Sequence, residues 1–488
     1  MTKINPAAVL LPGFVGTTLP RWLALRLQGG LAGVCLFGDN IDSLPQLREL
    51  TAEIVGANPL AVIAIDEEGG DVTRLFYDQG SPYPGNAVLG RIDDAAYTES
   101  VAASVGQQLR QAGCTIAFAP DVDINSNSDN PVIGVRSFGT DPDIVARHSA
   151  AWIHGLQATG IAASAKHFPG HGDTTQDSHL ALPIVDRSLE ELRERELVPF
   201  VAAIGAGAAT IMTSHILLPQ LDPDSPATLS TRILQGLLRA ELGFAGVIVS
   251  DALDMAGASA VTGIPEAAVR AIAAGCDLLC IGTDNSDAQL AEIEAAIATA
   301  VFDGRLDAER LADAATRTRK LATDSAARRA ATPIPDAAEP SFDLGITDGA
   351  FDVQPGVEVS ASRQLIAIDT LANLAIGVAP WAVGADRRLK EGEALGRVAI
   401  GQQLVLIGRD NHRHGWVREL IDSARERYPS VIVVDMGWPG DNRAYADIAT
   451  FGASRHVEAA LLDWLESHQN RSPRKPDSLI GNADRSNQ

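Results

Sequence analysis

Residues 161–179 read IAASAKHFPGHGDTTQDSH, an apolar run that passes directly into a polar loop rich in histidine. The short apolar part predicts a buried β-strand, and Lys166 and His167 stand where that strand ends. The same arrangement recurs along the chain, so this stretch introduces both the fold and the candidate site.

Eight short apolar runs of this kind occur before about residue 330, with helix-like segments between them. They are VLLPGFVG from Val9, GVCLFG from Gly33, AVIAIDEE from Ala61, CTIAFAPDVD from Cys114, IAASAKHF from Ile161, ATIMTSHI from Ala209, FAGVIVSD from Phe244 and CDLLCIG from Cys276. Connecting segments such as EELRERELVPFVAAIGAG carry apolar residues at helical spacing and end in glycine. Eight parallel strands with intervening helices predict an α/β fold, a (β/α)8 TIM-type barrel. The stretch from Gly69 to about Asp94, rich in Gly, Pro and Asp, is predicted to be a loop.

The remainder of the chain indicates a second domain. We expect the barrel at 1–325 and a linker at 326–345, where the sequence turns rich in proline and alanine and loses its periodicity. Runs such as RQLIAID, QLVLIG and SVIVVDMG then alternate with helical patterns, which predicts a smaller α/β (αβα sandwich) domain at 346–469. The polar tail, 470–488, is expected to be disordered.

Composition narrows the function. A length of 488 residues favours two domains, and a net charge of -23 disfavours nucleic acid or an anionic membrane surface as a partner. No apolar run is long enough to predict membrane insertion, and the N-terminal segment lacks a signal-peptide cleavage pattern, so cytoplasmic residence is expected. The four cysteines lie in apolar stretches and suggest neither a disulfide framework nor a redox motif.

Polar residues close five of the eight runs. They are Asp66, Asp121 and Asp123, Lys166 and His167, His215, and Asp251. Any one of them could be solvated or could cap the following helix. Because chemistry in such a barrel occurs at the carboxyl ends of the strands, their coincidence on five strands predicts one functional rim.

The densest of these loops holds Lys166, His167, His171, Asp173, Asp177 and His179. A metal site is one interpretation, since His and Asp at short spacing are normal ligands. The spacing matches no helical ligand pair and there is no carboxylate cage, so no metal and no cofactor is expected. The favoured interpretation is an acid/base pair in which Asp177 orients His179, because histidine titrates near neutral pH.

A partner nucleophile is expected across the rim. Asp251 in VIVSDALDM ends the seventh run and is the preferred candidate. Asp254, three residues later, is the competitor, although an acidic residue there is also expected from the dipole of the following helix.

The chain resembles glycoside hydrolase family 3, in its β-N-acetylglucosaminidase (NagZ-like) branch. The resemblance covers the whole barrel through LPGFVGTTLP, DEEGGDVTRL, NPVIGVRSFGTDP, KHFPGHGDTTQDSH, MTSHI and VSDALDM. It implies Asp251 as nucleophile and Asp177 with His179 as the acid/base dyad. It also implies a substrate-binding set made of Asp66, Arg74, Arg136, Lys166, His167 and Met212. A structural ion pair, for example Asp66 with Arg74, is the compatible alternative.

Glu67 is a departure from the family, because glutamine is common at this position in relatives. A Glu67 side chain that pointed into the pocket would disfavour anionic sugar groups. The alternative is that it faces the barrel wall.

The resemblance implies a retaining exo-β-N-acetylglucosaminidase that uses double displacement on a small glycoside containing N-acetylglucosamine, with peptidoglycan fragments as a source. One alternative is a phosphorylase, since a neutral histidine does not repel phosphate. Others are a catalytically inactive sugar-binding protein and a metal-dependent hydrolase. β-Glucosidase-type relatives usually take a carboxylic acid/base from the second domain. Here the barrel supplies a dyad, which leaves stability, partner contact or shaping of the pocket mouth as roles for that domain.

Overall fold

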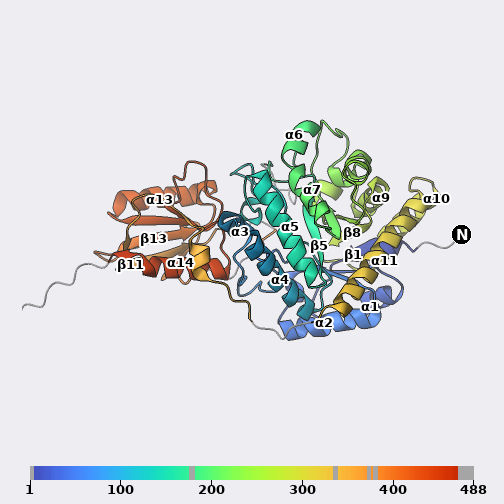
Figure 1. Cartoon of the computed structure of the whole chain (residues 1–488), viewed down its shortest axis with the longest axis horizontal. Coiled ribbons are helices and arrows are strands. Elements are labelled where there is room, and N and C mark those ends of the chain that lie inside the picture. Colours follow the sequence, from blue (N-terminus) through green and yellow to red (C-terminus); the bar gives the residue numbers. More distant parts are fainter. Residues whose placement is uncertain (1–4, 175–181, 334–338, 371–374, 377–382, 471–488) are drawn as a thin grey trace, which may run out of the picture.

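The computed structural model describes residues 5–174, 182–333, 339–370, 375–376 and 383–470. The eight predicted strands form one parallel sheet with the hydrogen-bonded order β1-β8-β7-β6-β5-β4-β3-β2, and β1 also lies against β2. The sheet therefore curls into a nearly closed barrel surrounded by helices (Figure 1). Its strands are β1 (Leu10–Pro12), β2 (Gly33–Leu36), β3 (Val62–Ile65), β4 (Ile116–Ala117), β5 (Ala162–Phe168), β6 (Thr210–Thr213), β7 (Val247–Ser250) and β8 (Leu278–Gly282).

The barrel strands are buried on both faces, which explains why they appear in the sequence as continuous apolar runs. Alternate residues from all eight strands, such as Cys35, Met212 and Val249, pack together inside the barrel. Their neighbours, such as Val34 and Ile248, pack against the surrounding helices. The predicted barrel is confirmed.

Several helices around the barrel begin at residues whose side chains cap the free amides of the first turn. Asp141 precedes Pro142 and accepts hydrogen bonds from the backbone amides of Asp143 and Ile144, and Ser188 forms a capping box with Glu191. These helices are α1 (Arg21–Gln28), α2 (Leu44–Ala57), α3 (Asn86–Ile92), α4 (Ala95–Ala112), α5 (Pro142–Ala158), α6 (Leu189–Glu194), α7 (Leu197–Gly205), the π-helical η5 (Arg232–Glu241), α8 (Ala256–Ser259), α9 (Ile264–Ala274), α10 (Asp287–Phe302) and α11 (Ala308–Ala331).

The predicted loop between Gly69 and Asp94 is wrong in its second half, because α3 occupies residues 86–92. Ala87 and Val88 of this helix pack into the core of the second domain. The flanking glycines and prolines mask the helix in the sequence, and its burial depends on a partner that lies more than 250 residues away.

The second domain is built on a six-stranded sheet with the order β12-β11-β13-β14-β15-β9, parallel except for β9. Val405 and Ile407 of β13 face α14, whereas Leu404 and Leu406 face α13. This alternation confirms the predicted αβα sandwich. Its elements are α12 (Leu344–Asp348), β9 (Asp352–Val353), β10 (Val359–Ser360), β11 (Arg363–Ile368), β12 (Arg387–Leu389), β13 (Gln403–Gly408), α13 (Gly415–Arg427), β14 (Val431–Asp435), β15 (Ile448–Ala449), α14 (Arg455–Ser467) and β16 (Gln469–Asn470).

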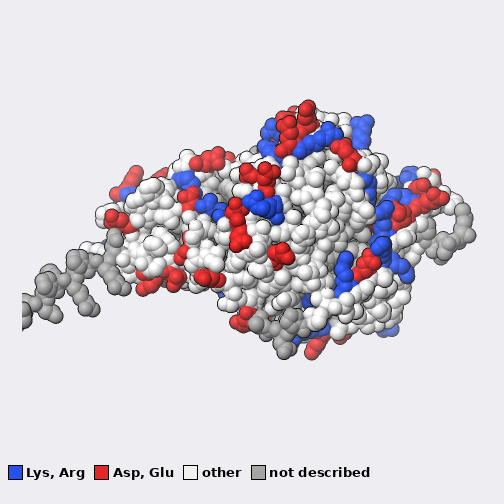
Figure 2. Space-filling view, viewed as in Figure 1, with Lys and Arg blue, Asp and Glu red and all other residues white. Residues whose placement is uncertain are grey.

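Between the domains, α11 runs to Ala331 and the next described helix, α12, begins at Leu344. The tail 471–488 lies outside the described residues. Within the described ranges, the helices include none that is long and apolar enough to cross a membrane. Figure 2 shows acidic and basic side chains interspersed on the face presented in Figure 1.

Candidate active site

Five barrel strands end in the polar residues that the sequence singles out. Asp66 follows β3, Lys166 and His167 belong to the end of β5, and Asp251 follows β7. Asp121 pairs with Lys166 in an isolated parallel bridge, so the segment after β4 lies beside the end of β5. The structure thus brings most of the predicted site residues to one end of the barrel.

Lys166 is the cation at the base of this cluster. Its Nζ lies 2.7 Å from Asp66 Oδ1 and 2.7 Å from Glu68 Oε1, with only 3% of the side chain exposed. Asp66 is more open, with 20% of its side chain exposed. Asp66 therefore presents a carboxylate to the solvent side while Lys166 fixes it from below.

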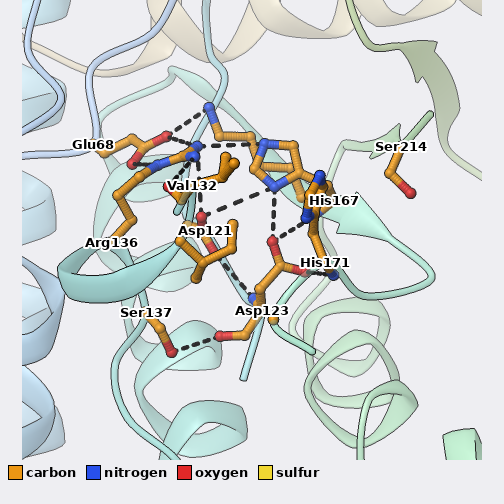
Figure 3. A network of polar contacts seen from close by, with 12 residues as sticks. Glu68, Asp121, Asp123, Val132, Arg136, Ser137, His167, His171 and Ser214 are labelled. Atoms are coloured by element: carbon orange, nitrogen blue, oxygen red, sulfur yellow. Dashed lines mark hydrogen bonds and ion pairs between the residues drawn. The ribbon is translucent and has the colours of Figure 1, made fainter. Parts of the chain in front are cut away.

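Arg136 is the second buried cation. It forms a bidentate pair with Glu68, with Nε 3.0 Å from Oε2 and Nη2 2.8 Å from Oε1. Its Nη2 also lies 3.5 Å from Asp121 Oδ2 and 3.3 Å from His167 Nε2. Figure 3 shows Arg136 between Glu68 and Asp121 with His167 beyond it. A bidentate pair fixes a guanidinium in orientation as well as in position.

The neighbouring cations lower the pKa values of Asp66 and Glu68. Burial alone would raise the pKa of Asp66, but the positive charges of Lys166 and Arg74 outweigh it and lower this pKa to about 2. For Glu68, Arg136 and Lys166 outweigh burial in the same way and lower the pKa to about 2. Both groups are therefore anionic at neutral pH and can accept hydrogen bonds from hydroxyl groups.

His167 forms a buried pair with Asp123, at 2.7 Å from Nδ1 to Oδ2. Because a guanidinium only donates, the contact with Arg136 makes Nε2 the unprotonated nitrogen and Nδ1 the donor. Burial and the charges of Arg136 and Lys166 lower the pKa of His167 well below its usual range. His167 is thus a neutral side chain in a fixed tautomer, with no proton on Nε2 for a leaving group.

Asp251 is half-buried at the end of β7, and its Oδ1 accepts a hydrogen bond from Ala252 N at 2.8 Å. Asp251 follows β7 at the same end of the barrel as His167 and His171, and its negative charge partly offsets the lowering of their pKa values by burial. Asp254, the competing candidate, is exposed and accepts a hydrogen bond from Thr283 N at 3.1 Å.

Glu67 does not point into the site. Its Oε2 accepts hydrogen bonds from Thr73 Oγ1, Arg74 N and Leu75 N at 2.9, 2.9 and 3.0 Å, and the side chain is buried. Glu67 therefore joins the two ends of the loop that runs from residue 67 to residue 75. Of the two positions considered from the sequence, the one pointing into the pocket is not observed, and the carboxylate is bound by its own loop.

The suggested ion pair between Asp66 and Arg74 is wrong. Asp66 pairs with Lys166, while Arg74 Nη2 donates to Ala375 O of the second domain at 2.8 Å. Arg74 still acts on Asp66 through its charge.

Two further predicted residues, Met212 and His215, have other positions. Met212 is buried in β6 and packs inside the barrel. His215, also buried, lies 3.0 Å from Ala252 O through Nε2 and so contacts the segment that follows Asp251. Asp177 and His179 lie outside the described residues.

A possible ligand cluster exists within the described residues, although the sequence disfavours a metal. Asp121, Asp123 and His167 each offer one ligand atom, and these atoms lie within 4.8 Å of one another. The donors are already engaged: Asp123 accepts from His167 and from His171 N, and the Arg136 cation lies beside Asp121. A metal ion would have to compete with that guanidinium.

Sequence reasoning missed Glu68 and left Asp123 without a role. Both are acidic residues at strand ends or in loops, where a solvated side chain is the ordinary expectation. The signal that could have identified them is charge balance, because two buried cations, Lys166 and Arg136, require buried anions near them.

The arrangement suits a neutral ligand that carries several hydroxyl groups. Fixed anions and cations alternate across the site, so neighbouring hydroxyls can each donate to a carboxylate and accept from a cation. A half-buried carboxylate, Asp251, stands at the same end of the barrel, and a carboxylate can attack an electrophilic carbon.

Comparison with known proteins agrees with this chemistry. β-Hexosaminidase A of Pseudoalteromonas piscicida is 36% identical over 334 residues, which cover 63% of this chain and 56% of that protein. This chain therefore matches little more than half the length of that relative.

Two solved structures are also similar. A glycoside hydrolase family 3 β-N-acetylglucosaminidase from Paenibacillus sp. str. FPU-7 superposes with a TM-score of 0.85 and 28% identity, covering 96% of this chain and 97% of that one. NagZ from Neisseria gonorrhoeae, in complex with N-trifluoroacetyl-D-glucosamine, superposes with a TM-score of 0.55 and 32% identity, covering 67% of this chain and 97% of its own. The model of the glycosyl hydrolase family 3 N-terminal domain matches residues 22–321. The chain belongs to glycosyl hydrolase family 3.

Proposed function

We propose that this protein is a retaining exo-β-N-acetylglucosaminidase. The observation that carries the proposal is the position of Asp251, a half-buried carboxylate that follows β7 at the end of the barrel where the cluster that suits sugar hydroxyls lies. Family membership and the names of the similar proteins support the reaction type and the sugar.

In the proposed reaction Asp251 attacks the anomeric carbon while an acid protonates the leaving oxygen, which gives a covalent glycosyl-enzyme. The same group, now a base, then deprotonates a water molecule that releases the sugar. His179, oriented by Asp177, takes this acid/base role on the strength of the sequence motif. His167 is unsuited to it, because its neutral Nε2 faces Arg136.

Asp66, Lys166 and Arg136 hold the hydroxyl groups of the terminal sugar in this proposal, with Arg74 and His167 beside them. The substrate is a small glycoside that ends in N-acetylglucosamine, with cell-wall fragments as its source. Cytoplasmic residence belongs to the same proposal, and cell fractionation would test it.

The test is turnover of an aryl N-acetylglucosaminide by the purified protein and by Asp251→Ala. We expect hydrolysis by the wild type and a loss of at least about a thousandfold in kcat for the variant. Wild-type-like turnover by Asp251→Ala would remove Asp251 from the nucleophile role. Products are compared with and without phosphate, because formation of a sugar 1-phosphate would replace hydrolysis by phosphorolysis.

A second comparison addresses the acid. His179→Ala should lose more activity on substrates with poor leaving groups than on those with good ones, since only the former need a proton in the transition state. Equal losses on both would contradict acid catalysis by His179.

A further inference from the structure

The loop that carries Asp66 and Arg74 ends in a tip held by the other domain. At this tip, Asp71 Oδ2 lies 2.6 Å from Arg409 Nη2, and its Oδ1 accepts a hydrogen bond from Ala453 N at 2.8 Å. Both carboxylate oxygens are thus engaged by the second domain, and only 4% of the Asp71 side chain is exposed. Asp71 is one of the few direct polar links between the two domains in the described part of the chain.

The position of Asp71 affects the site because hydrogen bonds within the loop connect Asp71 to the segment that carries Arg74. Glu67 binds the amides of Arg74 and Leu75, and Glu68 N donates to Val72 O at 3.0 Å. On the returning arm, Arg74 Nη2 donates to Ala375 O of the second domain. A displacement of the tip would therefore move the loop as a unit rather than bend it locally.

The same part of the second domain holds a second barrel loop. Arg413 Nη1 donates to Asn130 O at 3.0 Å. The Asn130 side chain donates in turn to His171 O at 2.9 Å and to Gly172 O at 3.0 Å. Through Asn130, the second domain is linked both to the loop that leads to Arg136 and to the loop after β5.

Residues 409–413, which we term the clamp segment, are themselves fixed in place. The segment directly follows β13, and the buried carboxylate of Asp435 accepts hydrogen bonds from Asp410 N at 2.8 Å and from Asn411 N at 2.9 Å. A rigid segment that contacts two loops can set their separation.

We propose that the clamp segment positions the sugar-binding loops, with Arg409 and Arg413 as positioning residues that act through Asp71 and Asn130. The second domain then sets the spacing between Asp66 and Arg136 without touching the sugar. The expected effect on KM rests on the proposed function. The effect of the clamp segment on the loops is tested separately, without substrate.

The kinetic test uses Arg409→Ala, Asp71→Asn and the double variant in the full chain. We expect KM for the aryl N-acetylglucosaminide to rise about tenfold in each, with a much smaller change in kcat, because displaced loops weaken sugar binding. The double variant should be no worse than the more affected single variant, because both break one contact. Arg409→Lys, which keeps the charge, should recover part of the loss.

Arg425→Ala is the matched control. Arg425 belongs to the same domain, pairs with Asp447 at 3.1 Å and donates to Ala444 O, so it binds its own domain and not a barrel loop. The Arg425→Ala variant should therefore retain the wild-type KM. Equal KM values for Arg409→Ala and Arg425→Ala, or fully additive effects in the double variant, would overturn the proposal.

Amide hydrogen exchange tests the clamp segment independently of the proposed function, because the measurement needs no substrate. The amides of Arg74 and Leu75 should exchange faster in Arg409→Ala than in wild type, and Arg425→Ala should leave them unchanged. Wild-type exchange in Arg409→Ala would overturn the clamp whatever the enzyme acts on. Faster exchange in a protein that hydrolyses no N-acetylglucosaminide would support the clamp while contradicting the proposed function.

Discussion

Lys166 Nζ lies 2.7 Å from Asp66 Oδ1, although the two residues are 100 positions apart in the chain. The contact joins the ends of β3 and β5 and places a fixed pair of opposite charges at the rim. Lys166 also contacts Glu68, so a single ammonium group pairs with two carboxylates.

Replacing this cation should lower both kcat/KM and stability. In Lys166→Met, Asp66 and Glu68 lose their shared partner, and we expect kcat/KM to fall at least about a hundredfold and the free energy of unfolding to fall by roughly 3 kcal/mol. Enzyme kinetics and urea denaturation measure the two effects. Lys320→Ala is the control, because Lys320 forms an exposed pair with Asp324 that contributes at most about 1 kcal/mol. Wild-type kcat/KM in Lys166→Met would contradict the assigned role.

The buried Glu67 should give the protein a measurable pH dependence. Burial raises the pKa of Glu67 from 4.5 to about 7, despite three hydrogen bonds that lower it. Between pH 4.5 and 7 the folded protein keeps a proton that the unfolded chain has released, so the free energy of unfolding falls as pH rises. This group contributes a slope of at most about 1.4 kcal/mol per pH unit.

Glu67→Gln cannot ionise and should lose that contribution. Urea denaturation of both proteins across this pH window measures the difference in slope. An unchanged slope in Glu67→Gln would show that the pH dependence comes from another group.

Asp277 should matter for stability and not for catalysis. It is fully buried just before β8, at the end of the barrel opposite the site, where Arg239 and Arg310 both pair with it. Asp277→Asn removes the charge between two arginines, and we expect a loss of roughly 3 kcal/mol in the free energy of unfolding. Because the amino-terminal end of a barrel serves stability, kcat/KM of the folded variant should stay within about twofold of wild type. A large fall in kcat/KM at a temperature where the variant is folded would contradict this division.

Chelation should leave activity unchanged. Asp121, Asp123 and His167 could offer ligand atoms to a metal, but Asp123 and His167 already bind each other and the Arg136 cation lies beside Asp121. Assays after dialysis against EDTA, with the metal content measured by mass spectrometry, check this. A stoichiometric metal whose removal abolishes turnover would favour the metal-dependent alternative.

The strands and the rim could be predicted because both are local properties of the sequence. A strand buried on both faces requires an apolar run, and the residue that ends the run marks the rim, as Asp66, Lys166 and Asp251 do. The helix α3 was missed because its burial depends on the second domain.

The ion pairs could not be predicted, because their partners are also distant in the sequence. Arg74 lies only eight residues from Asp66, and an ion pair between the two was the alternative considered from the sequence. The structure instead pairs Asp66 with Lys166, because parallel strands bring their ends together whatever the distance along the chain. The contact of Asp71 with Arg409 spans 338 positions and has no local signature.

The most direct test of the account is to trap the covalent intermediate. A fluorinated N-acetylglucosaminyl substrate that slows the second step is incubated with the enzyme, and the labelled peptide is identified by mass spectrometry. We predict one sugar per chain, attached to Asp251, and no label on Asp251→Ala. A label on another residue, or turnover with inversion at the anomeric carbon and no adduct, would contradict it.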